Sequence, residues 1–269
     1  MGDWMIKGRG LAPGKSRGAA VVCDQFISPL GEIGRDGTLN NSNCQGMKLP
    51  GKIFVFKGGK GSTVGSYVFL DLKGRGLAPA GIINESAEQM IVTGATISEI
   101  PMVDSIPIDI FYNGDIITID GKSGNVSIEN VTKKKITTVY LMRGDRLLLM
   151  KRSDRVSTYP SQYGGISGYM EANENPEQTG KREILEETGI SDAETVAEGK
   201  AIYVRNNNVI FEIYPVLMVT SMERVELNWE NSGYEWIKYD SVDKYETVPK
   251  FAKTFQTFLP VIRQGKLQQ

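Results

Sequence analysis

Histidine is missing from this sequence of 269 residues, and cysteine occurs only twice, at Cys23 and Cys44. Without an imidazole, the chain can form no Ser-His-Asp or Cys-His nucleophile pair and no His-ligated zinc site of its own. Any proton transfer must therefore fall to carboxylates, hydroxyls, Lys, Tyr, Cys or bound water.

Net charge and long apolar runs are also lacking. The 31 Lys and Arg residues are balanced by 32 Asp and Glu residues, so the basic footprint of a nucleic-acid-binding protein is absent. No uncharged apolar run approaches the roughly 18 residues of a membrane span, and the first ten residues lack an apolar signal core. Two cysteines form no disulfide framework that would suggest secretion. We therefore expect a cytoplasmic protein with neither a nucleic acid polymer nor a membrane as its partner.

The length of the chain predicts about two compact units. Frequent turn signals and short apolar runs up to about residue 131 are typical of a glycine-rich β structure with few helices. The strands expected there are 19–23, 52–56, 80–84, 108–113, 115–120 and 125–131. A basic run at 132–135 then precedes a new pattern of strands. We place a first domain at 1–132 and a second at 136–269.

The second half alternates strands with one strongly charged helix. Its expected strands are 136–142, 147–152, 201–205, 209–219 and 234–239. The charged helix is expected to begin at Pro176 with Asn175 as its N-cap, and to stop at Gly189. Apolar spacing predicts a last helix over 250–262, in which Pro260 is a potential break.

Three glutamates share one face of the charged helix. At about 100° per residue, Glu183, Glu186 and Glu187 fall within an arc of roughly 100°. Like charges at these spacings destabilise a helix, and the macrodipole also disfavours anions in its C-terminal half. A hard cation such as Mg²⁺ or Mn²⁺ would turn this repulsion into coordination. A solvated acidic face is the alternative for the bare motif, and we expect Ile184 and Leu185 to pack into a core.

The segment around this helix extends the motif. From Gly168 to Ile190 the sequence has Gly, five residues, Glu, seven residues, Arg-Glu, an aliphatic residue, any residue, Glu-Glu, any residue, Gly and an aliphatic residue. This pattern resembles the Nudix box, and the likeness to Nudix hydrolases covers about residues 136–262. The resemblance implies an α/β/α sandwich that cleaves the diphosphate bond of a nucleoside diphosphate derivative or of another organic diphosphate.

The resemblance also implies roles for individual residues. Its metal-binding and catalytic carboxylates would be Glu183, Glu186 and Glu187, with one of them or a later Glu as the base towards water. Arg182 would orient a glutamate, Glu174 would support the loop, and Gly168 would be structural. The sequence departs from the usual pattern at 166–167, where Pro-Gly is often found, and at Asn173, where Gly is frequent. Asn tolerates the left-handed conformation, so the second change is mild.

Charged residues outside the box are further candidates. Lys151 and Arg152 end an expected strand and could contact phosphates, although charges at strand ends are common. Glu212 and Glu230 are possible additional metal ligands.

A glycine-rich loop at 57–67 follows the expected strand 52–56. A strand, a glycine loop and a helix N-terminus can form an anion site from backbone N–H groups, here helped by Lys60. The loop is not a P-loop, because its spacing fails. The alternative is a tight turn in which Ser62 or Thr63 caps a helix. Spacing alone does not choose between the two.

The stretches 9–20, 28–31, 58–67, 80–84 and 100–104 carry a second resemblance. They resemble the small swivel subunit of the aconitase X group, in particular the small-subunit family of archaeal phosphomevalonate dehydratases, over about residues 5–131. The resemblance implies a swivelling β/β/α domain in which Ser62 removes a substrate proton and Lys60, Gly61 and Thr63 shape an anion pocket. It also implies a separate large subunit with an iron–sulfur cluster as Lewis acid.

Two cysteines are too few for a cluster of that kind, so we expect Cys23 and Cys44 to be small buried residues. Together the two resemblances predict a bifunctional chain of mixed α/β and α+β class. Its hydrolase would work alone, and its swivel domain would complete a dehydratase with the large subunit. Two alternatives stay open. The swivel domain could be a non-catalytic partner-binding module, or both domains could serve isoprenoid metabolism, with an isopentenyl-type diphosphate as the hydrolase substrate.

Overall fold

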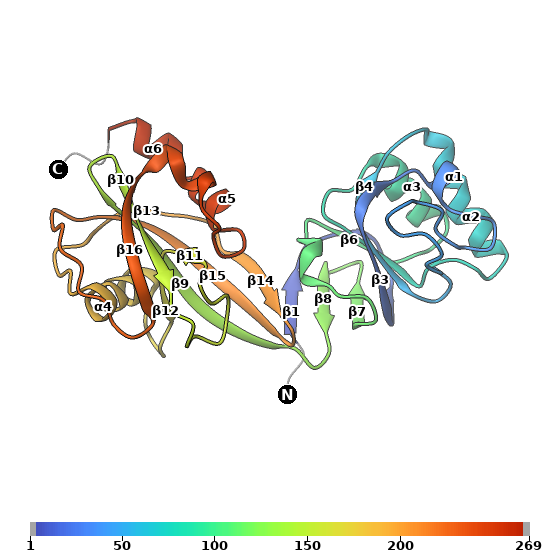
Figure 1. Cartoon of the computed structure of the whole chain (residues 1–269). Helices are drawn as coiled ribbons and strands as arrows, with labels where there is room; N and C mark the ends of the chain where they lie inside the picture. The colour runs from blue at the N-terminus through green and yellow to red at the C-terminus, as the bar shows by residue number, and fades with distance from the viewer. Residues whose placement is uncertain (1–3, 266–269) are drawn as a thin grey trace. The chain divides into compact units, whose positions relative to one another are not determined.

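The computed structural model describes residues 4–265, and the chain divides into two compact units. The first unit runs to Thr132 and also takes in Asn207–Ile210, while the second comprises Lys133–Asn206 and the chain from Phe211 onward. Figure 1 colours the first unit mainly from blue to green and the second mainly from yellow-green to red. The domain limits expected from the sequence, 1–132 and 136–269, stay a prediction.

One eight-stranded sheet forms the framework of the described part of the first unit, in the order β1-β8-β7-β3-β4-β5-β6-β2. Its strands are β1 (Trp4–Lys7), β2 (Arg9–Ala12), β3 (Lys15–Ile27), β4 (Ile53–Gly59), β5 (Gly81–Asn84), β6 (Met102–Asp104), β7 (Ile116–Asp120) and β8 (Asn125–Ile128). Strands β3 to β6 run parallel, whereas β1, β8, β7 and β3 form an antiparallel series. The long β3 thus joins a parallel part to an antiparallel part.

Helices pack on the parallel part of this sheet. They are α1 (Pro29–Glu32), α2 (Ser66–Gly74) and α3 (Gln89–Ile97), with a short 3-10 turn, η1 (Thr63–Gly65), before α2. Phe54 and Phe56 on β4 and Phe69 on α2 are fully buried in one apolar cluster between sheet and helices. Parallel strands need such covering because both of their faces are usually buried.

The sequence prediction was wrong at 108–113, where no strand forms. Pro107 precedes a 3-10 helix, η2 (Ile108–Ile110), and the Asp115 carboxylate then accepts the backbone N–H of Tyr112 at 2.7 Å. Gly114 follows with φ +89, which closes a turn before β7. The apolar run between proline and glycine therefore forms a 3-10 helix with Ile108 and Ile110 buried, followed by an exposed turn.

The two cysteines are buried, as expected, but they are not separate thiols. Cys23 on β3 and Cys44 in the following loop form a disulfide, with their Cα atoms 5.8 Å apart. The pairing corrects the expectation of two small unlinked residues, because the loop after α1 returns to the sheet where Cys23 lies.

A second eight-stranded sheet organises the described part of the other unit. Its strands are β9 (Thr132–Arg143), β10 (Arg146–Arg152), β11 (Tyr163–Gly164), β12 (Ile166–Tyr169), β13 (Glu194–Glu198), β14 (Ile202–Asn206), β15 (Val209–Val219) and β16 (Asn231–Lys238). The central order is β11-β10-β9-β15-β13, and β12, β14 and β16 pair with β9, β15 and β10. The basic run 132–135, which we expected to precede the first strand of this half, is itself the start of β9.

Both faces of this sheet are covered. Along β9, Val139 and Leu141 belong to one apolar cluster with Ile184 of α4 (Pro176–Thr188), whereas Tyr140 and Met142 belong to another. The second cluster includes three phenylalanines of the C-terminal segment, Phe251, Phe255 and Phe258. Figure 1 shows α4 on one side of the sheet and α5 (Phe251–Gln256) and α6 (Leu259–Arg263) on the other. Because side chains alternate along a strand, a continuous apolar run supplies both cores.

Helix α4 has the ends that the sequence predicts. The Asn175 side chain accepts the Gln178 N–H, and the Gln178 side chain accepts the Asn175 N–H, which is a capping box. Gly189 ends the helix with φ +70, a left-handed cap that glycine adopts without strain. The expected C-terminal helix is instead two short helices, α5 and α6, because the helix is interrupted at 257–258, just before Pro260.

None of the helices within residues 4–265 is long and apolar enough to cross a membrane.

Candidate functional site

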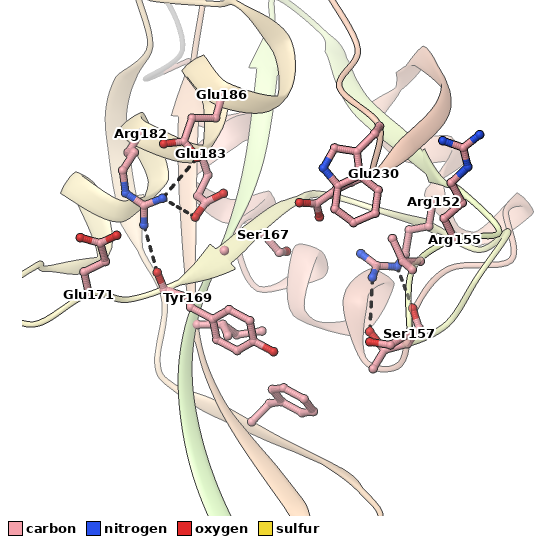
Figure 2. A pocket seen from close by; sticks show the side chains of 16 residues that line it. Arg152, Arg155, Ser157, Ser167, Tyr169, Glu171, Arg182, Glu183, Glu186 and Glu230 are labelled. Carbon is pink, nitrogen blue, oxygen red and sulfur yellow. Dashed lines mark hydrogen bonds and ion pairs between the residues drawn. The ribbon is translucent and has the colours of Figure 1, made fainter.

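A cavity of about 640 Å³ opens beside the N-terminal part of β9 and the box helix in the second unit. Its walls come from β9, β10, β12, β15 and α4, and from the loops after β10, after β12 and before β16. Four of the box residues line it: Gly168, Arg182, Glu183 and Glu186. Figure 2 shows these acidic side chains on one side of the view and Arg152 and Arg155 on the other. The cavity therefore brings carboxylates and guanidinium groups to one space.

Arg182 connects the acidic residues on one side of the cavity. Its Nε and Nη2 donate to the two carboxylate oxygens of Glu174 at 3.0 and 3.1 Å, and its Nη1 donates to Glu183 Oε1 at 2.7 Å. Nη2 also donates to the carbonyl of Tyr169 at 3.0 Å, a bond that Figure 2 displays. One planar guanidinium thus links α4, β12 and the loop before the helix. These are the contacts that the orienting role implied by the box requires.

Glu174 holds the loop in turn. Its carboxylate accepts the side-chain hydroxyl of Thr179 at 2.8 Å and the backbone N–H of Glu171 at 3.1 Å. The ion pair with Arg182 and these hydrogen bonds lower the pKa of Glu174 to about 2. Asn173, in the same loop, has φ +74, as its tolerance of the left-handed region predicts.

Gly168 faces Glu183 so closely that a side chain does not fit. A Cβ on Gly168 would overlap the Glu183 carboxyl group. Any larger residue at position 168 would therefore displace the Glu183 carboxyl group from its place against the backbone of β12.

Glu187 lies deeper than the other two box glutamates. It is 5% exposed and accepts Asn231 Nδ2 at 2.7 Å and the Ser167 N–H at 3.4 Å. Burial raises its pKa to about 7, and the charges of Glu230 and Glu183 add to the rise. Burial likewise raises the pKa of Glu183, despite its bond to Arg182. The carboxylates are thus crowded enough to disfavour one another as anions.

This crowding bears on whether a divalent cation fits. Among residues 4–265, no three acidic, His or Cys side chains already converge to hold a metal ion. The donor set nevertheless suits Mg²⁺ or Mn²⁺, since it consists of carboxylate oxygens whose repulsion a cation would relieve. Glu186 keeps 56% of its side chain exposed, 3.5 Å from Arg182, and is free to reorient on its helix. The residues therefore fit the ion in chemistry but do not enclose it as they stand.

The remaining sequence candidates divide into two groups. Arg152 and Glu230 line the cavity, whereas Lys151 and Glu212 do not. Lys151 instead lies over the ring of Tyr163, and Glu212 pairs with Lys133 at 3.0 Å. The prediction that Leu185 packs into a core was also wrong. Leu185 is 53% exposed, because it points away from the sheet that buries Ile184.

Several residues that line the cavity were not predicted from the sequence. Three lie in loops or on strands far from the box: Arg155, Phe211 and Trp229. Asn231, the partner of Glu187, begins β16. Only the folding of the chain brings these residues to the box.

The glycine-rich loop of the first unit lies between β4 and η1. Ser62 caps η1, accepting the Val64 N–H at 3.3 Å, so the capping interpretation is confirmed. Gly61 has φ +101 and packs against Ser28. Lys60 forms an ion pair with Glu32 at 3.1 Å, while Thr63 is exposed. Ser62 is itself exposed, so its hydroxyl is accessible to a ligand.

Glu32 is held in its charged form below this loop. Burial alone would raise its pKa, but bonds from Ser28 N, Lys60 and Asn41 lower it overall. The Ser28 N–H and Asn41 Nδ2 donate at 2.6 and 2.8 Å. Glu32 therefore balances the charge of Lys60 and fixes its position.

Comparison with known proteins separates the same two units. An aconitase X swivel domain model matches residues 5–128, and a NUDIX domain model matches residues 132–258. The phosphomevalonate dehydratase small subunit of Methanocaldococcus jannaschii is 42% identical over 127 residues, which are 46% of this chain and 98% of that protein. The one from Thermococcus kodakarensis is 41% identical over 126 residues, 46% of this chain and 95% of its own.

Two solved structures are each similar to part of the chain. The holo-form of Thermococcus kodakaraensis aconitase X has 40% identity and a TM-score of 0.45, over 46% of this chain and 97% of that chain. A C. elegans Ap4A hydrolase has 15% identity and a TM-score of 0.43, over 49% of this chain and 98% of that chain.

The chain belongs to the aconitase X swivel family in its first unit and to the NUDIX family in its second. The predicted pair of families and the predicted fold class are thereby confirmed. A NUDIX domain implies a hydrolase that acts on a diphosphate substrate, and NUDIX domains generally use divalent metal ions.

Proposed function

We propose that the second unit is a Mg²⁺- or Mn²⁺-dependent hydrolase of an organic diphosphate. The observation that carries this proposal is the cavity in which Glu183 and Glu186 face the guanidinium of Arg152. Glu183, Glu186 and Glu187 would hold the ion. It would supply charge neutralisation of the diphosphate and a lowered pKa of bound water.

The chain itself positions the reactants. Arg152 would bind the phosphate oxygens from the wall opposite the box, since its guanidinium is fixed by bonds to Thr158 O and Oγ1 at 3.0 and 3.3 Å. Arg182 would orient Glu183, and Glu174 would in turn orient Arg182. Water attacks a phosphorus atom, the phosphoanhydride bond breaks, and a cavity carboxylate takes the proton of the water.

Replacement of Glu186 tests this assignment. Glu186→Gln should lower Mg²⁺-dependent kcat on the order of 100-fold or more while leaving the circular dichroism spectrum unchanged. Glu177→Gln is the matched control, because Glu177 is on the same helix, pairs with Lys181 and does not line the cavity. Phosphate release from a panel of diphosphates, with and without Mg²⁺, is the measurement. Full activity of Glu186→Gln, or hydrolysis that continues unchanged after the metal is removed by a chelator, would show that the box was misinterpreted.

We propose further that the first unit acts as the small subunit of a dehydratase like its relatives, whose name makes them subunits of phosphomevalonate dehydratase. An aconitase X-type large subunit would then be the partner and would carry the iron–sulfur cluster. Ser62 would remove the substrate proton, with Lys60, Gly61 and Thr63 around the anion. Val64 in η1 and Tyr67 at the start of α2 are 52% and 63% exposed, which supports coverage by a partner.

Co-expression of the full chain with such a large subunit tests the partner. A stable complex that contains iron and dehydrates phosphomevalonate is the expected result. If no complex forms, the swivel domain is better explained as a non-catalytic module that binds a different protein.

A further inference from the structure

A second, smaller cavity adjoins the proposed hydrolase site. Its volume is about 100 Å³, and five of its lining residues also line the larger cavity: Ile136, Arg152, Thr158, Ser167 and Phe211. The two spaces therefore lie side by side and share part of their walls. We call the smaller one the apolar arm, for the residues described next.

Hydrocarbon forms most of the wall of the apolar arm. Ile136 on β9, Val204 on β14 and Phe211 and Ile213 on β15 contribute side chains, and Val248 and Pro249 complete the wall before α5. Burial of apolar ligand surface against such a wall is favourable, whereas burial of unpaired polar ligand groups is costly.

Polar side chains in the arm already have partners within the protein. The Thr138 and Ser167 hydroxyls bond to each other at 2.9 Å. Arg152 donates from Nε to the Thr158 carbonyl and from Nη2 to its hydroxyl. A site that discriminates a nucleobase presents donors and acceptors that the base then satisfies. In the apolar arm these polar groups are already bonded to one another. The arm can therefore recognise a ligand only by its shape and by apolar contact.

The size of the arm limits what it can hold. At roughly 30 Å³ for each water-sized group, its volume of about 100 Å³ admits a short hydrocarbon chain but not a nucleoside. Of the charged groups needed for the phosphates, Arg152 lines both spaces, whereas Glu183 and Glu186 line the larger cavity alone.

We infer that the substrate of the second unit is a short-chain alkyl or alkenyl diphosphate, with its chain in the apolar arm. This inference rests on the proposed hydrolase function. Water forms a bond to one phosphorus, the phosphoanhydride P–O bond breaks, and the products are the alkyl monophosphate, inorganic phosphate and a proton.

A substrate panel tests the inference on the full chain with Mg²⁺. Isopentenyl diphosphate and dimethylallyl diphosphate are compared with ADP-ribose and dATP. The kcat/KM for the five-carbon diphosphates should be at least tenfold higher. An equal or higher kcat/KM for the nucleotides would overturn the inference while leaving the hydrolase proposal intact.

Ile213 is the position at which to alter the arm, because it is only partly buried and lies outside the apolar core clusters of its unit. Ile213→Trp should lower kcat/KM for isopentenyl diphosphate at least tenfold but change that for methyl diphosphate less than twofold, since one carbon does not reach the arm. Ile202→Trp, on the neighbouring strand and outside both cavities, is the matched control and should change neither.

A second variant keeps the inference testable if Ile213→Trp fails to fold. Ile213→Ala enlarges the arm and should raise the ratio of kcat/KM for geranyl diphosphate over isopentenyl diphosphate at least fivefold. An unchanged ratio would count against the arm as the chain site. If the unaltered chain hydrolyses none of these diphosphates in the presence of Mg²⁺, the proposed function itself is refuted.

Discussion

At the scale of single residues, the burial of Glu187 couples the candidate site to pH. In the folded chain, burial raises the pKa of this carboxyl from 4.5 to about 7, so the folded state binds a proton that the unfolded state releases. A raised pKa of this kind contributes stability that is fully present below pH 4.5 and lost as the pH rises through about 7.

Metal-free chain should therefore lose stability between about pH 4.5 and 7 relative to the variant Glu187→Gln, whose amide does not titrate. The difference in pH dependence should amount to as much as about 3 kcal/mol. Thermal unfolding of both proteins in chelator, followed by circular dichroism from pH 5 to 8, measures it. Parallel pH profiles would mean that Glu187 is not buried in a way that disfavours its charge.

Gly168 gives a second prediction at this scale. Gly168→Ala should reduce hydrolase kcat at least about tenfold, because the added methyl displaces the Glu183 carboxyl and a small misplacement at a reacting centre is costly. Gly233→Ala is the matched control, since Gly233 lies in the same sheet and a Cβ there would make only an ordinary contact, 3.9 Å from Lys151 Cβ. Equal activity of Gly168→Ala and the unaltered chain would show that the position of Glu183 does not matter.

At the scale of elements, the caps of α4 determine where the box glutamates lie. Asn175→Ala removes one half of the capping box and should cost about 1 kcal/mol. Asn175→Asp keeps an acceptor oxygen and adds a negative charge near the helix N-terminus, so it should restore most of the loss. Chemical unfolding of the full chain, followed by circular dichroism, compares the three proteins. A stability of Asn175→Ala equal to that of Asn175→Asp would contradict the capping role.

The same helix shows what a sequence can predict. Its N-cap, first proline and terminal glycine act within a few residues, and all three lie where local rules place them. Short strands such as β2 and β6 were missed, because they are defined by pairing between residues about 95 apart, as in Arg9 with Asp104. The error at 108–113 has a different origin, since the buried isoleucines of a 3-10 helix form a short apolar run like that of a strand.

The candidate site was predictable to a similar extent. The box supplied Gly168, Glu174, Arg182 and the three glutamates, because one helix and its preceding loop hold them together. Asn231 and Trp229 could not be predicted, since they join the box only when the chain before β16 folds beside α4. The disulfide could not be predicted from the sequence either, because it forms only when the loop that carries Cys44 folds back to β3.

At the scale of the whole molecule, the two proposed activities should be separable by substitution. In a complex of the full chain with a large subunit, Ser62→Ala should abolish dehydration while leaving complex formation and diphosphate hydrolysis unchanged. Glu186→Gln should have the reverse effect on the two reactions. Both activities are measured on each purified complex. Loss of both reactions from one of these substitutions would indicate coupling between the units that separate sites do not predict.

Separate hydrophobic interiors have an evolutionary consequence. The apolar cluster around Phe54 belongs to the first unit, and those around Val139 and Tyr140 belong to the second. A substitution inside one cluster changes the packing of its own unit, so selection can alter the stability of each unit through the residues of its own interior. Recombination that exchanges the chain up to Thr132 would have to accommodate Asn207–Ile210 as well, because the first unit takes in this segment of the later sequence.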